Sequence, residues 1–159
     1  MNEQGMTLYN APLPALVKEV RGNYQLTTPL GRQTQLQRDV DFGKPNAKLK
    51  QPILYKGGAE KIKHDYQVFD RYDIMNGIED FENGFFFYRF KCRLVIYDPT
   101  TNVEFTVCEG YGSANTRESN AGNASGFDVA NSKLKIARKR SMVDAVINML
   151  DRLESEESY

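Results

Sequence analysis

The chain has 159 residues, with 21 basic and 21 acidic side chains and therefore no formal net charge at neutral pH. Apolar residues make up 40% of it and aromatic residues 11%, which is typical of one globular domain with a core of its own. No apolar run is long enough to cross a membrane, and the start of the chain lacks the pattern of a signal peptide.

The N-terminal region gives weak signals for regular structure. Leu13, Leu16, Val17 and Val20 follow the i, i+3, i+4, i+7 spacing of a short amphipathic helix, which Gly22 would end. The polar stretch 27–37 predicts a loop. Residues 59–63 predict another short helix, and residues 68–75 predict an edge strand.

The stretch 84–112 gives the clearest signal in the chain, because apolar residues alternate with other residues over a long run. Phe86, Tyr88, Phe90, Cys92, Leu94 and Ile96 occupy the even positions. The odd positions carry a row of cations, which we call the strand cation row: Arg89, Lys91 and Arg93. This period of two predicts a strand with one face on the core. The basic face would either contact a polyanion or be an ordinary solvated surface.

The residues after this strand predict a hairpin with a four-residue loop at Asp98–Thr101. Matching the apolar faces pairs Tyr97 with Asn102, Leu94 with Phe105, Cys92 with Val107 and Arg89 with Gly110. This register places Thr106, Cys108, Gly110 and Gly112 beside the cations, where small residues would let a polymer backbone approach. It also separates the two cysteines, so we expect no disulfide and a reducing, cytoplasmic location.

The C-terminal part predicts a mobile loop at 110–126 and then one long helix. The helix would begin near Asn131–Ser132 and end near Leu153, although Ser125 with Asp128 would also make a suitable earlier start. At about 100° per residue, the apolar side of its second half continues backwards into cations at Lys135, Arg138 and Lys139. Lys133 falls near the centre of the polar side. We expect the helix cations and the strand cation row to face the same phosphates.

Basic residues gather in two segments of this neutral chain, 44–63 and 133–140, whereas acids gather at 70–82 and in the tail. Such segregation favours a local polyanion site over surface scatter. The candidate DNA-binding residues are Arg89, Lys91, Arg93, Lys133, Lys135, Arg138, Lys139, Arg140, Lys56 and Lys61. His64 is the only histidine, and no catalytic or metal-ligand spacing is present. We therefore expect no enzyme activity, no metal and no cofactor.

Several segments in order resemble the Sak-like single-strand annealing proteins of phages, which are relatives of the eukaryotic recombination protein Rad-fifty-two. The resemblance covers about residues 39–147, and its most specific pieces are GAEK, FENGFFFYRFKCRL and ARKRSMVDA. It implies a β-β-β-α core, ring or helical homo-oligomers, and a basic groove for single-stranded DNA. The Lys139–Arg140 pair matches the family's helical cation pair, but Val143 stands near the place where the eukaryotic pattern has a further cation.

We accordingly expect an α+β fold, with an antiparallel hairpin in a three-stranded sheet followed by a long helix, and short helices near the N-terminus. Residues 1–12 would be mobile, 13–153 would form one domain and 154–159 an acidic tail. The expected function is to bind single-stranded DNA and anneal complementary strands in phage-type recombination, without ATP, in the bacterial host cytoplasm. A host single-strand-binding protein is a possible partner, and we expect no association with a membrane. The alternatives are a passive single-strand DNA- or RNA-binding protein and a phage protein that binds or inhibits another protein.

Overall fold

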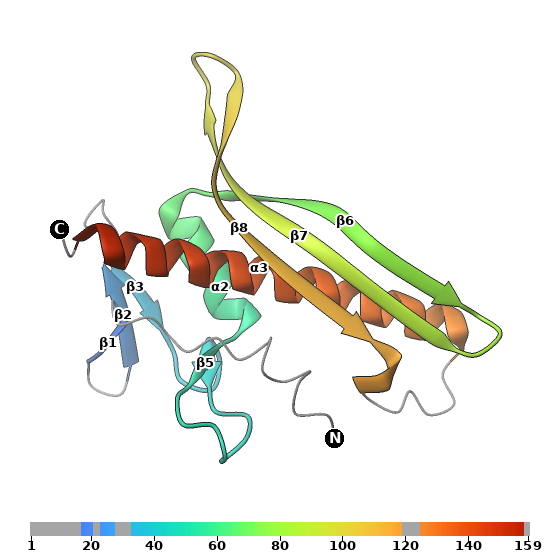
Figure 1. Ribbon diagram of the computed structural model, residues 1–159. Helices are drawn as coiled ribbons and strands as arrows, with labels where there is room; N and C mark the ends of the chain where they lie inside the picture. Colours follow the sequence, from blue (N-terminus) through green and yellow to red (C-terminus); the bar gives the residue numbers. More distant parts are fainter. Residues whose placement is uncertain (1–16, 21–22, 28–32, 119–124, 158–159) are drawn as a thin grey trace.

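The computed structural model describes residues 17–20, 23–27, 33–118 and 125–157 and has the expected α+β fold (Figure 1). A three-stranded antiparallel sheet has the order β6–β7–β8 and consists of β6 (Phe69–Asp80), β7 (Phe85–Asp98) and β8 (Val103–Asn115). A short 3-10 helix (Thr116–Glu118) follows β8, and the long helix α3 (Gly126–Glu157) closes the chain. The predicted hairpin, edge strand and long helix are therefore confirmed.

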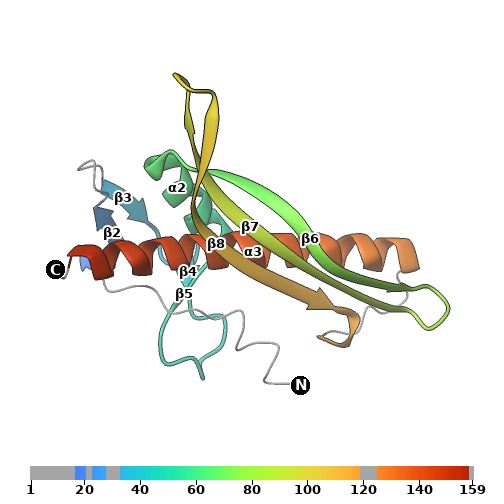
Figure 2. The same cartoon turned by 45° about the horizontal axis from the view of Figure 1, so that its top comes forward.

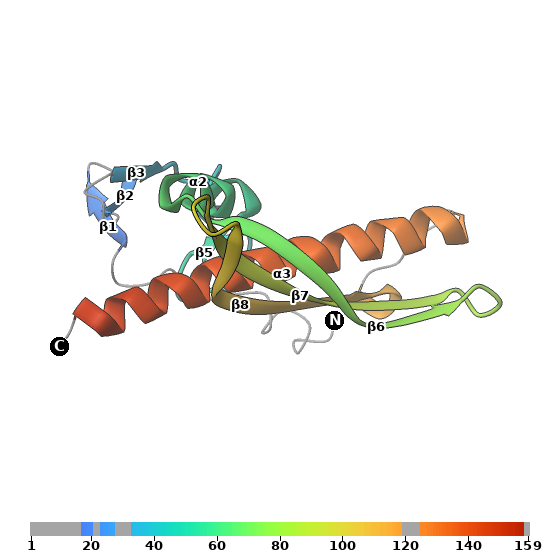
Figure 3. The same ribbon diagram turned by 90° about the horizontal axis from the view of Figure 1, so that it is seen from above.

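The helix α3 lies between two layers, with the sheet on one side and the N-terminal elements on the other (Figure 3). The second layer consists of α2 (Lys56–Tyr66), a three-stranded sheet of β1 (Val17–Val20), β2 (Asn23–Thr27) and β3 (Gln33–Leu36), and a two-stranded pair of β4 (Phe42–Gly43) and β5 (Ile53–Leu54). This layer covers only the C-terminal half of α3. The N-terminal half extends past α2, as Figures 2 and 3 show.

The N-terminal region contains strands where we predicted a helix and a loop. Val17–Val20 pairs with β2, with Val17 opposite Leu26, so the predicted helix is wrong for these residues, and positions 13–16 lie outside the described residues. The predicted loop at 27–37 contains β3, which pairs with β2. A four-residue apolar stripe fits a helix by spacing alone, but strand pairing overrides so weak a preference.

The hairpin of β7 and β8 has a different register from the predicted one. Asp98 pairs with Val103, which moves the loop one residue along the chain, and Asn102 in the loop adopts a left-handed backbone with φ 57°. A bulge between Leu94 and Val95 then shifts the pairing again, so that Cys92 lies opposite Gly110. The extra residue at the bulge exchanges the faces of β8. Gly110 and Gly112 consequently face α3 and do not border the cations.

These two glycines let the backbone of α3 lie directly on β8. A Cβ atom on Gly110 would lie 2.1 Å from the backbone nitrogen of Ala145, and one on Gly112 would lie 2.2 Å from that of Ser141. Both distances are far below any real contact, so only glycine fits at either position.

Polar side chains of α3 cover the outer edge of β8. Arg152 donates to the carbonyl of Val107 (3.1 Å) and Asn148 to that of Glu109 (3.0 Å). Farther along, Asp144 accepts from the Tyr111 amide (2.8 Å), and Arg140 donates to the carbonyl of Ser113 (2.7 Å). Four residues of a helix rise about 6 Å and two residues of a strand rise about 6.8 Å. Every fourth residue of α3 can therefore meet every second residue of β8. We call these four side chains, Arg140, Asp144, Asn148 and Arg152, the edge ladder.

The even positions of β7 form the core face, as the alternation predicted. Phe86, Tyr88, Phe90, Cys92 and Leu94 are buried, but Ile96 is 41% exposed because β7 and β8 continue beyond the body as a projecting arm (Figure 1). The loop predicted at 110–126 is shorter than expected, since β8 runs to Asn115. The earlier of the two suggested helix starts is correct: the Ser125 hydroxyl accepts from the Asp128 amide at 3.2 Å.

Replacing Gly110 with alanine should destabilise the protein strongly, because the new Cβ would overlap the backbone of α3. Overpacking of this kind costs about 3 kcal/mol or more when backbone must move. The matched control is Gly77→Ala, where the nearest atom would lie at 3.6 Å, an ordinary contact. Thermal melts followed by circular dichroism measure both. Equal melting temperatures for the two variants would contradict the close approach of helix and strand.

Candidate nucleic-acid interface

Three cations gather on the N-terminal half of α3, beyond the described elements of the N-terminal layer, and we call Lys135, Arg138 and Lys139 the helix cation cluster. Lys135 and Lys139 each precede by seven residues, about two turns, a buried residue of the core that α3 shares with the N-terminal layer and the sheet, Met142 and Val146 respectively. The apolar side of α3 thus becomes cationic where the N-terminal layer ends, as predicted. Lys135 and Arg138 are exposed and Lys139 is half-buried.

The cluster is free of ion pairs with any acid in the described part of the chain. Arg138 instead lies over the ring of Tyr72 on β6, with its Cζ 4.3 Å from the ring centroid. A cation on an aromatic face keeps its charge and its in-plane N–H donors. The cluster therefore presents positive charge that internal acids do not neutralise.

A buried ionic network lies beneath Arg138. Lys63 of α2, only 6% exposed, contacts Asp70 of β6 at 2.5 Å and Glu60 at 2.9 Å. Burial alone would raise the pKa of Asp70, but hydrogen bonds from Lys63 and the Tyr72 hydroxyl outweigh it and hold that pKa below its usual value. Burial and the bond to Asp70 raise the pKa of Tyr72, which stays neutral. The network fixes β6 against α2 next to the cluster.

The strand cation row lies on the opposite face of the sheet from α3, so the expectation that strand and helix cations face the same phosphates is wrong. The even positions of β7 pack against α3, and the odd positions therefore point away from it. Two of the three cations are also paired across strands: Lys91 with Glu109 at 3.2 Å and Arg93 with Asp73 at 3.0 Å. Arg89 is exposed and lies 5.6 Å from the ring centroid of Phe87.

Two further candidates on α3 point toward the sheet. Lys133 is only 5% exposed, although we predicted it on the solvated polar side. Arg140 belongs to the edge ladder and also pairs with Glu118 at 2.7 Å. Both corrections have one cause: the polar side of α3 packs on β8. Only Lys139 of the Lys139–Arg140 pair therefore joins the cluster.

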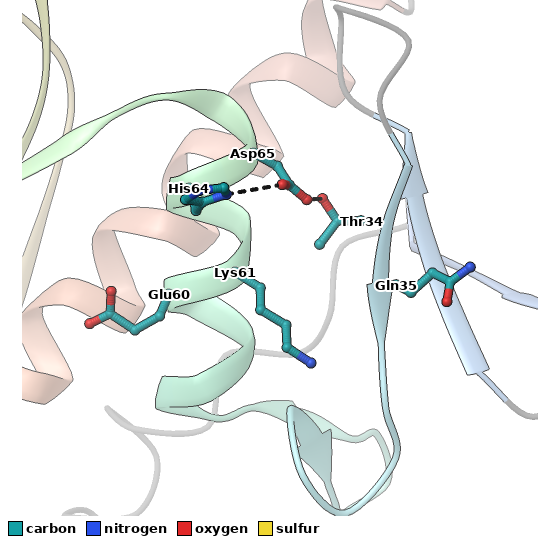
Figure 4. Close-up of a pocket in the computed structure, with 6 residues that line it drawn as sticks. All are labelled: Thr34, Gln35, Glu60, Lys61, His64 and Asp65. Carbon is teal, nitrogen blue, oxygen red and sulfur yellow. Dashed lines mark hydrogen bonds and ion pairs between the residues drawn. The ribbon is translucent and has the colours of Figure 1, made fainter.

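The two candidates on α2, Lys56 and Lys61, have different surroundings. Lys56 is exposed at the first turn, whereas Lys61 contacts the buried carboxylate of Asp41 at 2.5 Å. Lys61 also lines a shallow hollow between β3 and α2 (Figure 4). In this hollow the Thr34 hydroxyl donates to Asp65, which also lies 3.4 Å from His64. These groups satisfy one another and form no catalytic arrangement.

Sequence reasoning missed the contribution of β6 to this interface. The sequence shows residues 70–82 only as a segment where acids gather, but Asp70 is tied to Lys63, and Tyr72 supports Arg138. The alternation of Asp70, Tyr72 and Ile74 with Arg71 and Asp73 carries the signal. This signal is weak, because the polar residue Asp70 occupies one of the inward positions and hides the period-two alternation.

The described residues contain no group of ligands suited to a metal ion, and none of their helices is long and apolar enough to cross a membrane. Cys92 and Cys108 are both free, as expected. The bulge places Cys108 opposite Leu94 and thus on the face of Cys92, which corrects the predicted separation of the cysteines. Burial raises the pKa of Cys92 to about 12, so this thiol stays protonated and unreactive.

Comparisons of the sequence with protein-family models and with curated proteins found no match.

The Lys63–Asp70 pair gives a pH prediction. Because the pKa of Asp70 is lowered on folding, its stabilisation is present above the unfolded pKa of about 3.8 and is lost as the pH falls through the folded value. Asp70→Asn imitates the protonated acid and should destabilise the protein at pH 7 by roughly 2 kcal/mol. Urea unfolding of both proteins from pH 7 to pH 2.5 should show this difference shrinking toward zero. A constant difference would contradict the ionic role.

Proposed function

We propose that the protein binds single-stranded DNA through the helix cation cluster and anneals complementary strands without ATP, as the resemblance to Sak-like annealing proteins implies. The observation that carries the proposal is the cluster itself. Lys135, Arg138 and Lys139 are unpaired with described acids and lie on a chain with no net charge; Lys135 and Lys139 continue the apolar side of α3, and Arg138 lies over Tyr72 of β6.

The physical basis of annealing is neutralisation of phosphates. Two strands repel each other through their backbones, and cations that bind one backbone lower this repulsion without reading sequence. Lys135 and Lys139 are four residues apart on α3, about 6 Å along its axis, close to the spacing of phosphates along an extended strand. Bound in this way, a strand can keep its bases accessible to a complement.

Self-association would serve this function, because several protomers would hold one DNA strand along its length. Exposed apolar side chains lie on the projecting arm (Ile96, Val103 and Phe105), on β6 (Ile74, Met75 and Ile78) and at the start of α3 (Phe127). No described strand pairs with the outer edge of β6, whereas the edge ladder covers β8. Exposed apolar groups and an open edge favour contact with other copies of the chain. The proposal includes a homo-oligomer, either a ring or a helical filament.

The strand cation row offers a second candidate surface for nucleic acid. Arg89 beside Phe87 and Arg117 over the ring of Phe85 (5.0 Å to its centroid) resemble the cation–aromatic surfaces that bind single strands. We favour the helix cation cluster because Lys91 and Arg93 are already neutralised by Glu109 and Asp73.

A charge-matched pair of double variants separates the two surfaces. Lys135→Ala with Lys139→Ala should weaken binding of an oligo-dT at least about ten-fold and reduce the salt slope by about 1.4, two single-strand contacts at 0.7 each. Lys91→Ala with Arg93→Ala removes the same charge but should change affinity less than about three-fold, since both cations are paired. Fluorescence anisotropy from 50 to 200 mM salt measures this, with thermal melts as the control. The opposite ranking would assign binding to the outer sheet face.

Annealing and assembly are tested together. The wild-type protein should accelerate pairing of complementary oligonucleotides without ATP and should scatter light as an oligomer at micromolar concentration. Retention of DNA without acceleration would identify a passive single-strand-binding protein. A monomer that neither retains nor anneals DNA would favour the alternative of a protein that binds another protein.

A further inference from the structure

We propose that Tyr72 is a positioning residue for the DNA-binding site: its ring, held by Phe90 and Asp70, fixes the guanidinium of Arg138 in the helix cation cluster. This inference rests on the proposed function and names a residue of β6 that no cation pattern points to. Tyr72 and Arg138 come from different elements, and their contact is the point at which β6 meets the exposed half of α3.

The ring of Tyr72 is held on two sides. Phe90, which is buried, meets it edge-on with ring centroids 6.5 Å apart and planes at 86°. Its hydroxyl donates to Asp70, which is itself fixed by the buried Lys63. A half-buried ring with a perpendicular aromatic neighbour and an engaged hydroxyl has little freedom to rotate. One face of it is occupied by Arg138 at 4.3 Å.

The other two cation–aromatic contacts of the described chain lack such support. Arg89 lies 5.6 Å from the ring centroid of Phe87, and Arg117 lies 5.0 Å from that of Phe85. Both contacts are longer than that of Arg138, and among the described residues neither Phe87 nor Phe85 has an aromatic neighbour like Phe90. Arg138 therefore has the shortest and best supported of the three contacts.

Order at Arg138 matters because an arginine side chain otherwise loses much rotamer freedom on binding. A guanidinium held over a ring still keeps N–H donors, and a phosphate can accept two of them. No described residue accepts a hydrogen bond from this guanidinium, so the donors are available. Tyr72 thus lowers the entropic cost of a phosphate contact that Arg138 makes.

The test is a double-mutant cycle on oligo-dT affinity, with Tyr72→Leu to remove the ring and Tyr72→Phe to keep it. Tyr72→Leu should weaken binding about five-fold, within the range of a cation–aromatic contact, and Tyr72→Phe less than about two-fold. In an Arg138→Ala background Tyr72→Leu should have no further effect, whereas in a Lys135→Ala background it should keep its full effect. Phe87→Leu, the same kind of change under Arg89, is the matched control and should leave affinity unchanged.

Two outcomes would overturn the inference. If Tyr72→Leu weakens binding equally with and without Arg138, then Tyr72 acts on the DNA or the fold and not through Arg138. If Tyr72→Phe weakens oligo-dT binding as much as Tyr72→Leu does, then the face of the ring does not position Arg138.

A measurement without DNA separates this inference from the proposed function. The side-chain Nε–Hε NMR signal of Arg138, assigned by its loss in Arg138→Lys, should be shifted by the ring current in the wild-type protein and in Tyr72→Phe. It should return to the random-coil position in Tyr72→Leu, or in Tyr72→Met if the leucine variant does not fold. A shifted signal in a protein that fails to bind oligo-dT would refute the function and leave the contact intact. An unshifted wild-type signal would refute the contact whatever the protein binds.

Discussion

The close approach of α3 to β8 is the constraint on which the other features of the structure depend. Gly110 and Gly112 remove the side chains that would separate the two backbones. Once helix and strand touch, the polar groups along the β8 edge lose water and need partners, because an unpaired buried amide or carbonyl costs about 1–3 kcal/mol. The edge ladder supplies these partners at the helical period. Part of the polar side of α3 therefore lies along the edge of the sheet.

The way α3 packs on β8 explains where its cations lie. With its polar side on the sheet, α3 turns its apolar side to the N-terminal layer, which ends near the middle of the helix (Figure 3). Beyond that point the same direction is open to solvent, and the residues there are Lys135 and Lys139 instead of apolar ones. The site and the core are thus two halves of one helix side. Lys133 and Arg140 belong to the sheet-facing side and are held within the fold.

Much of this arrangement could be predicted from local patterns, because period and capping are properties of neighbouring residues. The alternation of β7, the edge strand and the direction of Lys135, Arg138 and Lys139 follow from spacing alone. The register of β8 could not, because the local alternation does not mark the bulge between Leu94 and Val95, which turns Gly110 and Gly112 toward α3. The same holds for Val17–Val20, whose four residues fit either period until β2 pairs with them. Each error arose where pairing or packing with another segment decided the outcome.

The overall charge is zero, but the two basic surfaces differ in how many of their cations are paired with acids. On the outer sheet face the charges of neighbouring strands cancel, as Asp73 and Glu109 do for Arg93 and Lys91. On α3 an aromatic ring takes the place of a carboxylate beneath Arg138, which supports the side chain without cancelling its charge. A polyanion would therefore meet an uncompensated field at the helix cation cluster and a largely compensated one at the strand cation row. Proximity of an acid, more than the number of cations, decides which basic surface is available to a phosphate backbone.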